Sequence, residues 1–243
     1  MIYEHLFQDG GQTIFEIRSC DPEIYRRRKD PHRRTQYRVL GRDLARQSKA
    51  TTYQLITNVD MHTSIMAVNH QIYAETAHVL YTNRSFSFGR DIEAIVPFFS
   101  DLSTSIRPMV QRLALVKQGS VYTRDFDRCE WANVCEFLRE NMQVQSLHIV
   151  VEGGRPALGW DGLPEFNRSD FKTLQSVAYE PLSWVWELLT VRGIQNLEIG
   201  SEIHRCPTSH SNAMAFFATF SAAIEGGFAD FLRSEMVTTT VAV

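Results

Sequence analysis

The chain has 243 residues, of which 44% are hydrophobic and 22% charged, with 15 Phe, 8 Tyr and 4 Trp. This composition is ordinary for a globular protein and excludes wholesale disorder, because the large apolar side chains suffice to fill a core. The net charge of −3 hides an asymmetry, since residues 18–49 carry 11 Lys/Arg and 4 Asp/Glu while the rest of the chain is acidic.

The cysteines are scattered without CxxC spacing, which favours a reducing compartment over a disulfide framework; they are Cys20, Cys129, Cys135 and Cys206. The first seven residues lack the basic start and long apolar segment of a signal peptide. The longest mostly apolar stretch, residues 213–224, is too short to span a bilayer. We therefore expect a soluble protein of the nucleus or cytoplasm, with no part in a membrane.

In chain order, residues 1–7 are predicted to be the end of an amphipathic helix that Asp9-Gly10-Gly11 stops. Residues 13–18 alternate apolar and polar side chains, which predicts a short strand. Residues of about 18–58 are predicted to form a basic inserted loop, because apolar anchors are few there.

The densest part of this loop is open to three interpretations: a solvated loop, a nuclear-import signal, or a phosphate-binding patch. Its basic residues are Arg26, Arg27, Arg28, Lys29, Arg33 and Arg34. A nucleic-acid surface is not expected, because only Tyr25 and Tyr37 supply aromatic rings for stacking.

Residues 64–81 show apolar residues at three- and four-residue steps, which predicts a helix with one buried stripe. The stripe comprises Ile65, Val68, Ile72, Thr76 and Val79, and Asp60 or Thr63 is the predicted cap. Asn69 and Glu75 are expected to be exposed. Residues 85–88 predict a strand, and residues 91–102 a helix that Pro97 kinks or divides.

Four later segments share an apolar residue, then Gln, then any residue, then two apolar residues separated by one; they are residues 110–115, 144–149, 174–179 and 194–199. Helical patterns lie between them, notably at residues 131–141 and 182–191. This alternation predicts a degenerate, leucine-rich-repeat-like layer of short parallel strands and helices. The aligned residues Leu113, Leu147, Val177 and Leu197 are predicted to enter one core from adjacent parallel strands.

The C-terminal residues 216–232 form an aromatic helical stripe that Gly226-Gly227 is predicted to break. Residues 153–162 predict a Gly/Pro-rich loop. Trp184 and Trp186 are two apart on a predicted helix, so one is expected to face inward and the other more outward. No metal or cofactor is expected, because His204, Cys206 and His210 lack the paired close ligands of a structural zinc site.

The run Val68-Asn69-His70-Gln71-Ile72-Tyr73-Ala74-Glu75, followed by Leu80-Tyr81 and Phe86-Ser87-Phe88, resembles the signature of a large fungal F-box-like family. The similarity covers about residues 1–8 and 60–116. Of the family's usual opening helix only Met1-Ile2-Tyr3-Glu4 matches, which predicts a truncated first helix. The resemblance implies docking to a Skp adaptor of a cullin-type ubiquitin ligase through Ile2, Leu6, Phe7, Ile72, Tyr73 and Leu80.

The expected fold is therefore α/β, with an F-box-like helical region at residues 1–103 and a repeat-like α/β region at residues 104–243. The expected function is non-enzymatic protein interaction. The expected partners are other proteins, and binding to nucleic acid or to a membrane is not expected. Two alternatives stay open. One is a stand-alone scaffold whose F-box has decayed, and the other is an enzyme without a recognisable motif, since the common nucleotide-binding and hydrolase signatures do not occur.

Overall fold

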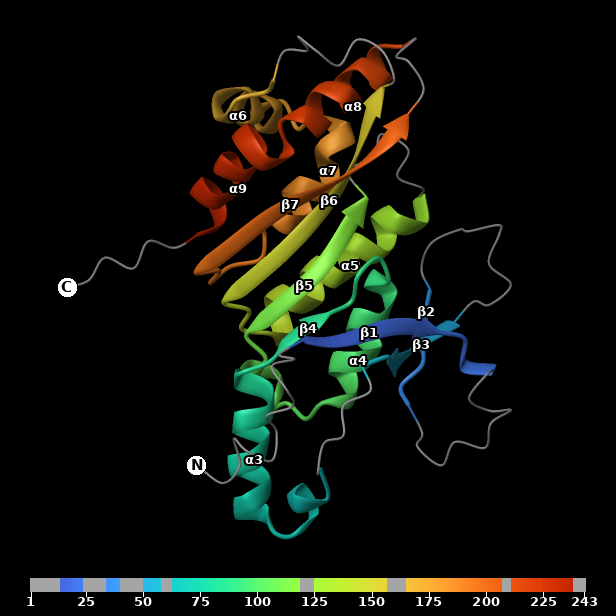
Figure 1. Ribbon diagram of the computed structural model, residues 1–243, viewed down its shortest axis with the longest axis vertical. Coiled ribbons are helices and arrows are strands. Elements are labelled where there is room, and N and C mark those ends of the chain that lie inside the picture. The colour runs from blue at the N-terminus through green and yellow to red at the C-terminus, as the bar shows by residue number, and fades with distance from the viewer. Residues whose placement is uncertain are drawn as a thin grey trace, which may run out of the picture.

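The computed structural model describes residues 14–23, 34–39, 50–57, 63–118, 125–156, 165–206 and 211–237. The chain is a mixed α/β protein built on one sheet in the order β2-β3-β1-β4-β5-β6-β7 (Figure 1). Strand β1 and strands β4 to β7 are parallel, whereas β3 runs antiparallel to both β1 and β2. The strands are β1 (Ile14–Cys20), β2 (Tyr37–Arg38), β3 (Ala50–Leu55), β4 (Ser85–Ser87), β5 (Arg112–Gln118), β6 (Ser146–Pro156) and β7 (Asn196–Cys206).

Helices connect the parallel strands, and Figure 1 shows β5 and β6 in front of α5 and α7. The α-helices are α3 (His70–Thr82), α4 (Ile95–Asp101), α5 (Asp125–Asn141), α6 (Arg168–Ser176), α7 (Ser183–Leu188), α8 (Asn212–Ala222) and α9 (Ala229–Met236). Short helical turns are η1 (Thr63–Ala67), η2 (Ile92–Ala94), η3 (Arg107–Met109), η4 (Glu180–Leu182) and η5 (Ile224–Phe228).

Three of the four aligned apolar residues occupy one row across adjacent parallel strands. Leu113 on β5 pairs with Leu147 on β6, which pairs with Leu197 on β7, and all three are buried. The prediction for Val177 is wrong, because this residue ends helix α6 and is 66% exposed. The Asn167–Asp170 capping box starts a helix there, so this segment does not extend into a strand.

The region of residues 14–103 contributes strands as well as helices. Phe15 on β1 lies beside Phe86 on β4, and Phe86 lies beside Leu113 on β5. These residues and the C-terminal aromatic residues belong to one hydrophobic core cluster. The sheet and the core therefore continue across residues 103 and 104, where the two predicted regions meet.

Helix α3 buries only part of the predicted stripe: Thr76 is buried, whereas Ile65, Ile72 and Val79 are half-buried and Val68 is exposed. Asn69 caps it by accepting a 2.9 Å hydrogen bond from the Ile72 amide, so the helix begins after Val68. Val68 is 63% exposed, and the residues that are buried are Thr76, Ala77 and Leu80. Asn69 and Glu75 are exposed, as predicted.

Residues 153–156 continue strand β6 and do not form the predicted loop, because β7 pairs with them throughout. Helix α8 lies against this part of β6, where the Gly154 amide donates a 2.9 Å hydrogen bond to Ser221 Oγ. A Cβ at Gly154 would lie 2.4 Å from Phe217 Cε1. The glycine is therefore required by the close approach of the helix.

The C-terminal helices are divided at Gly226, whose backbone is not helical, as the sequence predicts. By length and apolar composition none of the described helices crosses a membrane alone, and only α8 with the following 224–236 segment qualifies as a pair, bent by 64°. Much of this pair lies in the protein core, including Phe220, Phe228 and Phe231.

The outer edge of β7 is blocked by two charged side chains from this C-terminal part. Glu225 accepts hydrogen bonds from the Ser201 amide (3.1 Å) and hydroxyl (2.7 Å). Arg233 Nε donates to the Leu197 carbonyl at 3.4 Å. Two of the backbone groups that another strand would need, the Ser201 amide and the Leu197 carbonyl, are thus already engaged.

Candidate functional site

Two surfaces of the described chain combine exposure with chemistry that the fold does not require. The first is the elbow formed by η1, Val68 and the first turns of α3. Val68 is 63% exposed and Tyr73 is 38% exposed. Ile65, Met66 and Ile72 are half-buried. In Figure 1 the elbow lies beyond the end of the sheet, and only the second half of α3 packs into the core.

The residues predicted to bind an adaptor are distributed unevenly over this elbow. Tyr73 is accessible and Ile72 is half-buried, whereas Leu80 is 5% exposed and belongs to the core. The side chain of Leu80 therefore stabilises the fold. Ile2, Leu6 and Phe7 lie outside the described residues.

Of the basic patch, only Arg34 lies within the described residues, and β3 engages it. Its guanidinium donates a 2.5 Å hydrogen bond to the Tyr53 carbonyl and lies 5.0 Å from the centre of the Tyr53 ring. The Tyr53 hydroxyl in turn donates to Asp101 at 2.8 Å. Burial, reinforced by the Asp101 carboxylate, raises the pKa of Tyr53 far above its usual value.

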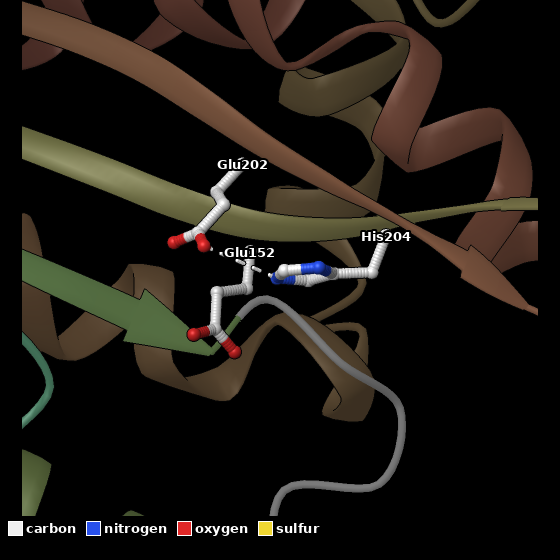
Figure 2. Close-up of side chains that lie close together, drawn as sticks. All are labelled: Glu152, Glu202 and His204. Atoms are coloured by element: carbon white, nitrogen blue, oxygen red, sulfur yellow. Dashed lines mark ion pairs between the residues drawn. The ribbon is translucent and has the colours of Figure 1, made fainter.

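The second surface is a charged cluster in the carboxyl-terminal halves of β6 and β7. Glu152 and Glu202 are directly paired residues of these strands, and His204 follows two positions later on β7. Figure 2 shows the three side chains lying together, and their ligating atoms all fall within 4.8 Å of one another. In open α/β sheets, ligands bind at the carboxyl ends of the strands.

Arg90, in the turn after β4, supplies a cation to this cluster. Its guanidinium contacts Glu152, lies 2.9 Å from Glu202 Oε1 and lies 3.4 Å from His204 Nε2. Two carboxylates directly opposite each other on adjacent strands repel, and a shared guanidinium relieves that repulsion. Two carboxylates and an imidazole could also hold a divalent metal ion, but here the guanidinium contacts the same oxygens.

The spacing of Glu152 and Glu202 from the shared motif is a sequence signal for this cluster. Glu152 and Glu202 each lie five residues after the aligned Leu147 and Leu197, so in-register strands must place them side by side. The sequence suggested His204 only as a member of a zinc-ligand set with Cys206 and His210. His204 and Cys206 lie on β7, and His210 lies outside the described residues.

A buried lysine lies between the sheet and the helices. Lys117 on β5 is 1% exposed, and its amine lies 5.1 Å from the ring centre of Trp131 and 5.6 Å from that of Trp184. Trp131 Nε1 donates a 2.7 Å hydrogen bond to the Trp184 carbonyl. Trp184 is buried and Trp186 half-buried, which confirms the predicted difference between them. Burial also raises the pKa of the neighbouring Cys135 thiol.

A surface depression between the start of α6 and Gly226-Gly227 has no comparable set of converging groups. It is lined by Arg168 and Lys172 but also by Asp230. The amides that open α6 are already occupied, since Asn167 Oδ1 accepts from Ser169 at 2.8 Å. This helix start therefore does not offer free amides to an anion.

Comparison with known proteins gives no relative from which a function can be transferred. No protein-family model matches the chain, no curated protein matches it, and no solved structure matches it.

Proposed function

We propose that this chain is a non-enzymatic protein-interaction module that contacts its partner through the η1–α3 elbow. The observation that carries the proposal is the exposure of Val68 and Tyr73 on an elbow whose Ile65 and Met66 pack against the core. Apolar and aromatic side chains grouped on an exposed helix are typical anchors of protein interfaces.

The partner class follows from the sequence resemblance. Val68 to Glu75 are the residues that resemble the F-box-like signature, and most of them are exposed on the elbow. They are therefore available to another protein, and the proposed partner is a Skp-type adaptor. The contact is expected to be weak, because Leu80 is committed to the core and cannot be an anchor.

The experiment measures binding of a purified fungal Skp adaptor by calorimetry. The test variants are Val68→Asp and Tyr73→Ala, which place a charge on the elbow or remove its ring. Val177→Asp is the matched control, because Val177 is about equally exposed (66% against 63%) but lies at the end of α6, away from the elbow. We expect the elbow variants to weaken binding at least tenfold, equivalent to about 1.4 kcal/mol, and the control to change it less than twofold.

Equal binding by all three variants would show that the elbow is not the contact surface. The burial of Leu80 favours a second candidate, a scaffold that binds a protein other than an adaptor. If the unmodified chain does not bind the adaptor, partners are compared by quantitative affinity purification with the same variants. The scaffold function then requires a partner that Val68→Asp loses and Val177→Asp retains.

A further inference from the structure

An exposed threonine ties the start of the short strand β2 to helix α4 through one carboxylate. Thr35 lies two residues before β2, in a stretch without regular secondary structure, and both it and Asp101 are exposed. The Thr35 amide donates to the two carboxylate oxygens of Asp101, each at 3.2 Å, and its hydroxyl donates to Oδ1. Because Asp101 is the last residue of α4, the threonine hydroxyl lies at the C-terminal end of a helix, against an acid.

The groups that Asp101 accepts from are neutral. Besides Thr35, its hydrogen-bond donor is the Tyr53 hydroxyl, at 2.8 Å. Within the described part of the chain, Asp101 forms no ion pair with a lysine or an arginine. Negative charge added to Thr35 would therefore meet a carboxylate without an ion-pair partner.

The contacts of Thr35 are a large part of what attaches residues 34–38 to the body. Strand β2 adds only two residue pairs with β3. The Thr35 carbonyl accepts a 2.9 Å hydrogen bond from the Thr52 hydroxyl, and the Tyr37 hydroxyl accepts one of 2.6 Å from Asn133 on α5. Helix α4, which carries Asp101, lies beside β3 (Figure 1). So short a strand depends on such side-chain contacts to stay in place.

The sequence before this threonine is basic. Arg33-Arg34 directly precedes Thr35, and residues 26–29 are Arg-Arg-Arg-Lys. Protein kinases select their substrates partly by charge, and a kinase with an acidic substrate groove favours an exposed serine or threonine that follows arginine. The hydrogen bonds between Thr35 and Asp101 are exposed to solvent, so the local opening that a kinase needs costs little free energy.

We propose that Thr35 is a phosphorylation site for an arginine-directed kinase, and that the phosphate releases residues 34–38 from α4 and β3. In the transfer, Thr35 Oγ forms a bond to the γ-phosphorus of ATP while the bond from that phosphorus to the β–γ bridging oxygen breaks. ADP leaves, and the hydroxyl proton passes to a base of the kinase. The product no longer has the proton that Asp101 accepted, and it carries a charge of about −1.5 to −2 at pH 7. Beside an aspartate at a helix C-terminus, such a group is repelled.

Arg34 defines the opposite outcome. Its guanidinium is directed at the Tyr53 carbonyl and ring, on β3. If the phosphate on Thr35 paired with this guanidinium, the segment would be held more tightly after phosphorylation. Release and tightening change the backbone exchange rates of residues 34–39 in opposite directions, so one measurement separates them.

The first experiment locates the phosphate. The whole chain is incubated with ATP and, separately, with the catalytic subunits of protein kinase A and protein kinase C, both arginine-directed kinases. Mass spectrometry then identifies the modified residues. We expect Thr35 to be the main site with at least one kinase, and Thr35→Val to lose that modification. Phosphate on neither preparation of Thr35, or preferential modification of Ser48, which follows Arg46 in the same basic region, would overturn the site.

The second experiment measures release by hydrogen–deuterium exchange. We expect phosphorylation to accelerate exchange of residues 34–39 and 50–55 at least tenfold, and to leave residues 196–206 of β7 unchanged. Asp101→Asn is the matched variant, because its side chain keeps the shape and an accepting oxygen but has no charge. Phosphorylation of this variant is expected to accelerate exchange less than threefold.

Three results would overturn the release. Unchanged exchange would mean that the phosphate does not detach the segment, and slower exchange would mean that Arg34 holds it. Equal acceleration in the unmodified chain and in Asp101→Asn would exclude charge repulsion as the cause. None of these measurements involves the adaptor or the η1–α3 elbow, so this proposal and the proposed function fail separately.

Discussion

At the residue scale, Arg90 is the cation that lets Glu152 and Glu202 stand directly opposite each other. We expect Arg90→Gln to lower the free energy of unfolding by about 1 kcal/mol, because the paired carboxylates then repel across the strands. Adding Glu152→Gln should restore most of that loss, since one carboxylate no longer needs a counterion. Urea unfolding of the single and double variants measures both values. A double variant less stable than Arg90→Gln would contradict this electrostatic role.

Asp91 makes the free energy of unfolding depend on pH, in a direction that follows from the shift of its pKa. Burial raises the pKa of its carboxyl, although the Ser19 amide partly opposes this by donating a 3.2 Å hydrogen bond. An acid with a raised folded-state pKa binds its proton more tightly in the folded state. Its contribution is therefore fully present below the unfolded pKa of about 3.9 and is lost as pH rises through the folded pKa.

Asp91→Asn is consequently expected to raise the free energy of unfolding at pH 7, because asparagine resembles the protonated acid. The gain over the unmodified chain should vanish below about pH 3.9. Chemical unfolding of both proteins across this pH range measures the difference. A variant that is less stable at pH 7 would mean that the charged form of Asp91 is the favoured one.

At the element scale, the packing of α8 on β6 depends on Gly154. Gly154→Ala places a Cβ 2.4 Å from Phe217 Cε1, and overpacking of this kind costs about 1–3 kcal/mol. Gly200→Ala is the matched control on the neighbouring strand, because its Cβ would meet only ordinary contacts at 3.7 Å and 3.8 Å. We expect thermal unfolding to show a loss for Gly154→Ala and almost none for Gly200→Ala. Similar losses for both would assign the effect to strand propensity.

The elements that were predictable from the sequence are those in which local pattern and burial agree. The shared motif placed Leu113, Leu147 and Leu197 in one register, because every strand that it starts buries the same face. The pattern failed at Val177, where the capping signal of Asn167 outweighs three apolar residues. The charged cluster of Arg90, Glu152 and Glu202 was harder to predict from local sequence patterns of this kind.

Tertiary contacts explain most of what the sequence could not reveal. Gly153-Gly154 is typical of a loop, and only the neighbouring α8 makes glycine necessary inside a strand. The stripe on α3 was wrong at Val68, because this residue precedes the helix, and it missed Ala77 and Leu80, which are buried beside Thr76. Arg90 is distant in sequence from Glu152 and Glu202, so only strand order brings the three together.

At the scale of the whole molecule, the sheet ends at a strand whose free edge is guarded. Glu225→Ala with Arg233→Ala removes the two side chains that bond to the Ser201 amide and the Leu197 carbonyl at this edge of β7. We expect the Ser201 amide to exchange about fivefold faster, equivalent to about 1 kcal/mol for a lost hydrogen bond, and static light scattering to rise with concentration. Glu187→Ala with Arg192→Ala removes the same charges from exposed positions and is the control. Equal scattering by the two double variants would contradict the guarding role.

Because β7 follows β6 in the chain, β6 is an edge strand during part of the synthesis of the protein. Strand β6 is complete at Pro156 and β7 at Cys206, so 50 residues separate the two ends. At about 5–20 residues per second, the ribosome needs about 3–10 s to supply the missing neighbour. During that interval β6 is the outermost strand of the growing sheet, and Glu225 and Arg233 have not yet been made. The nascent chain thus depends on its surroundings for protection that the finished protein carries in its own side chains.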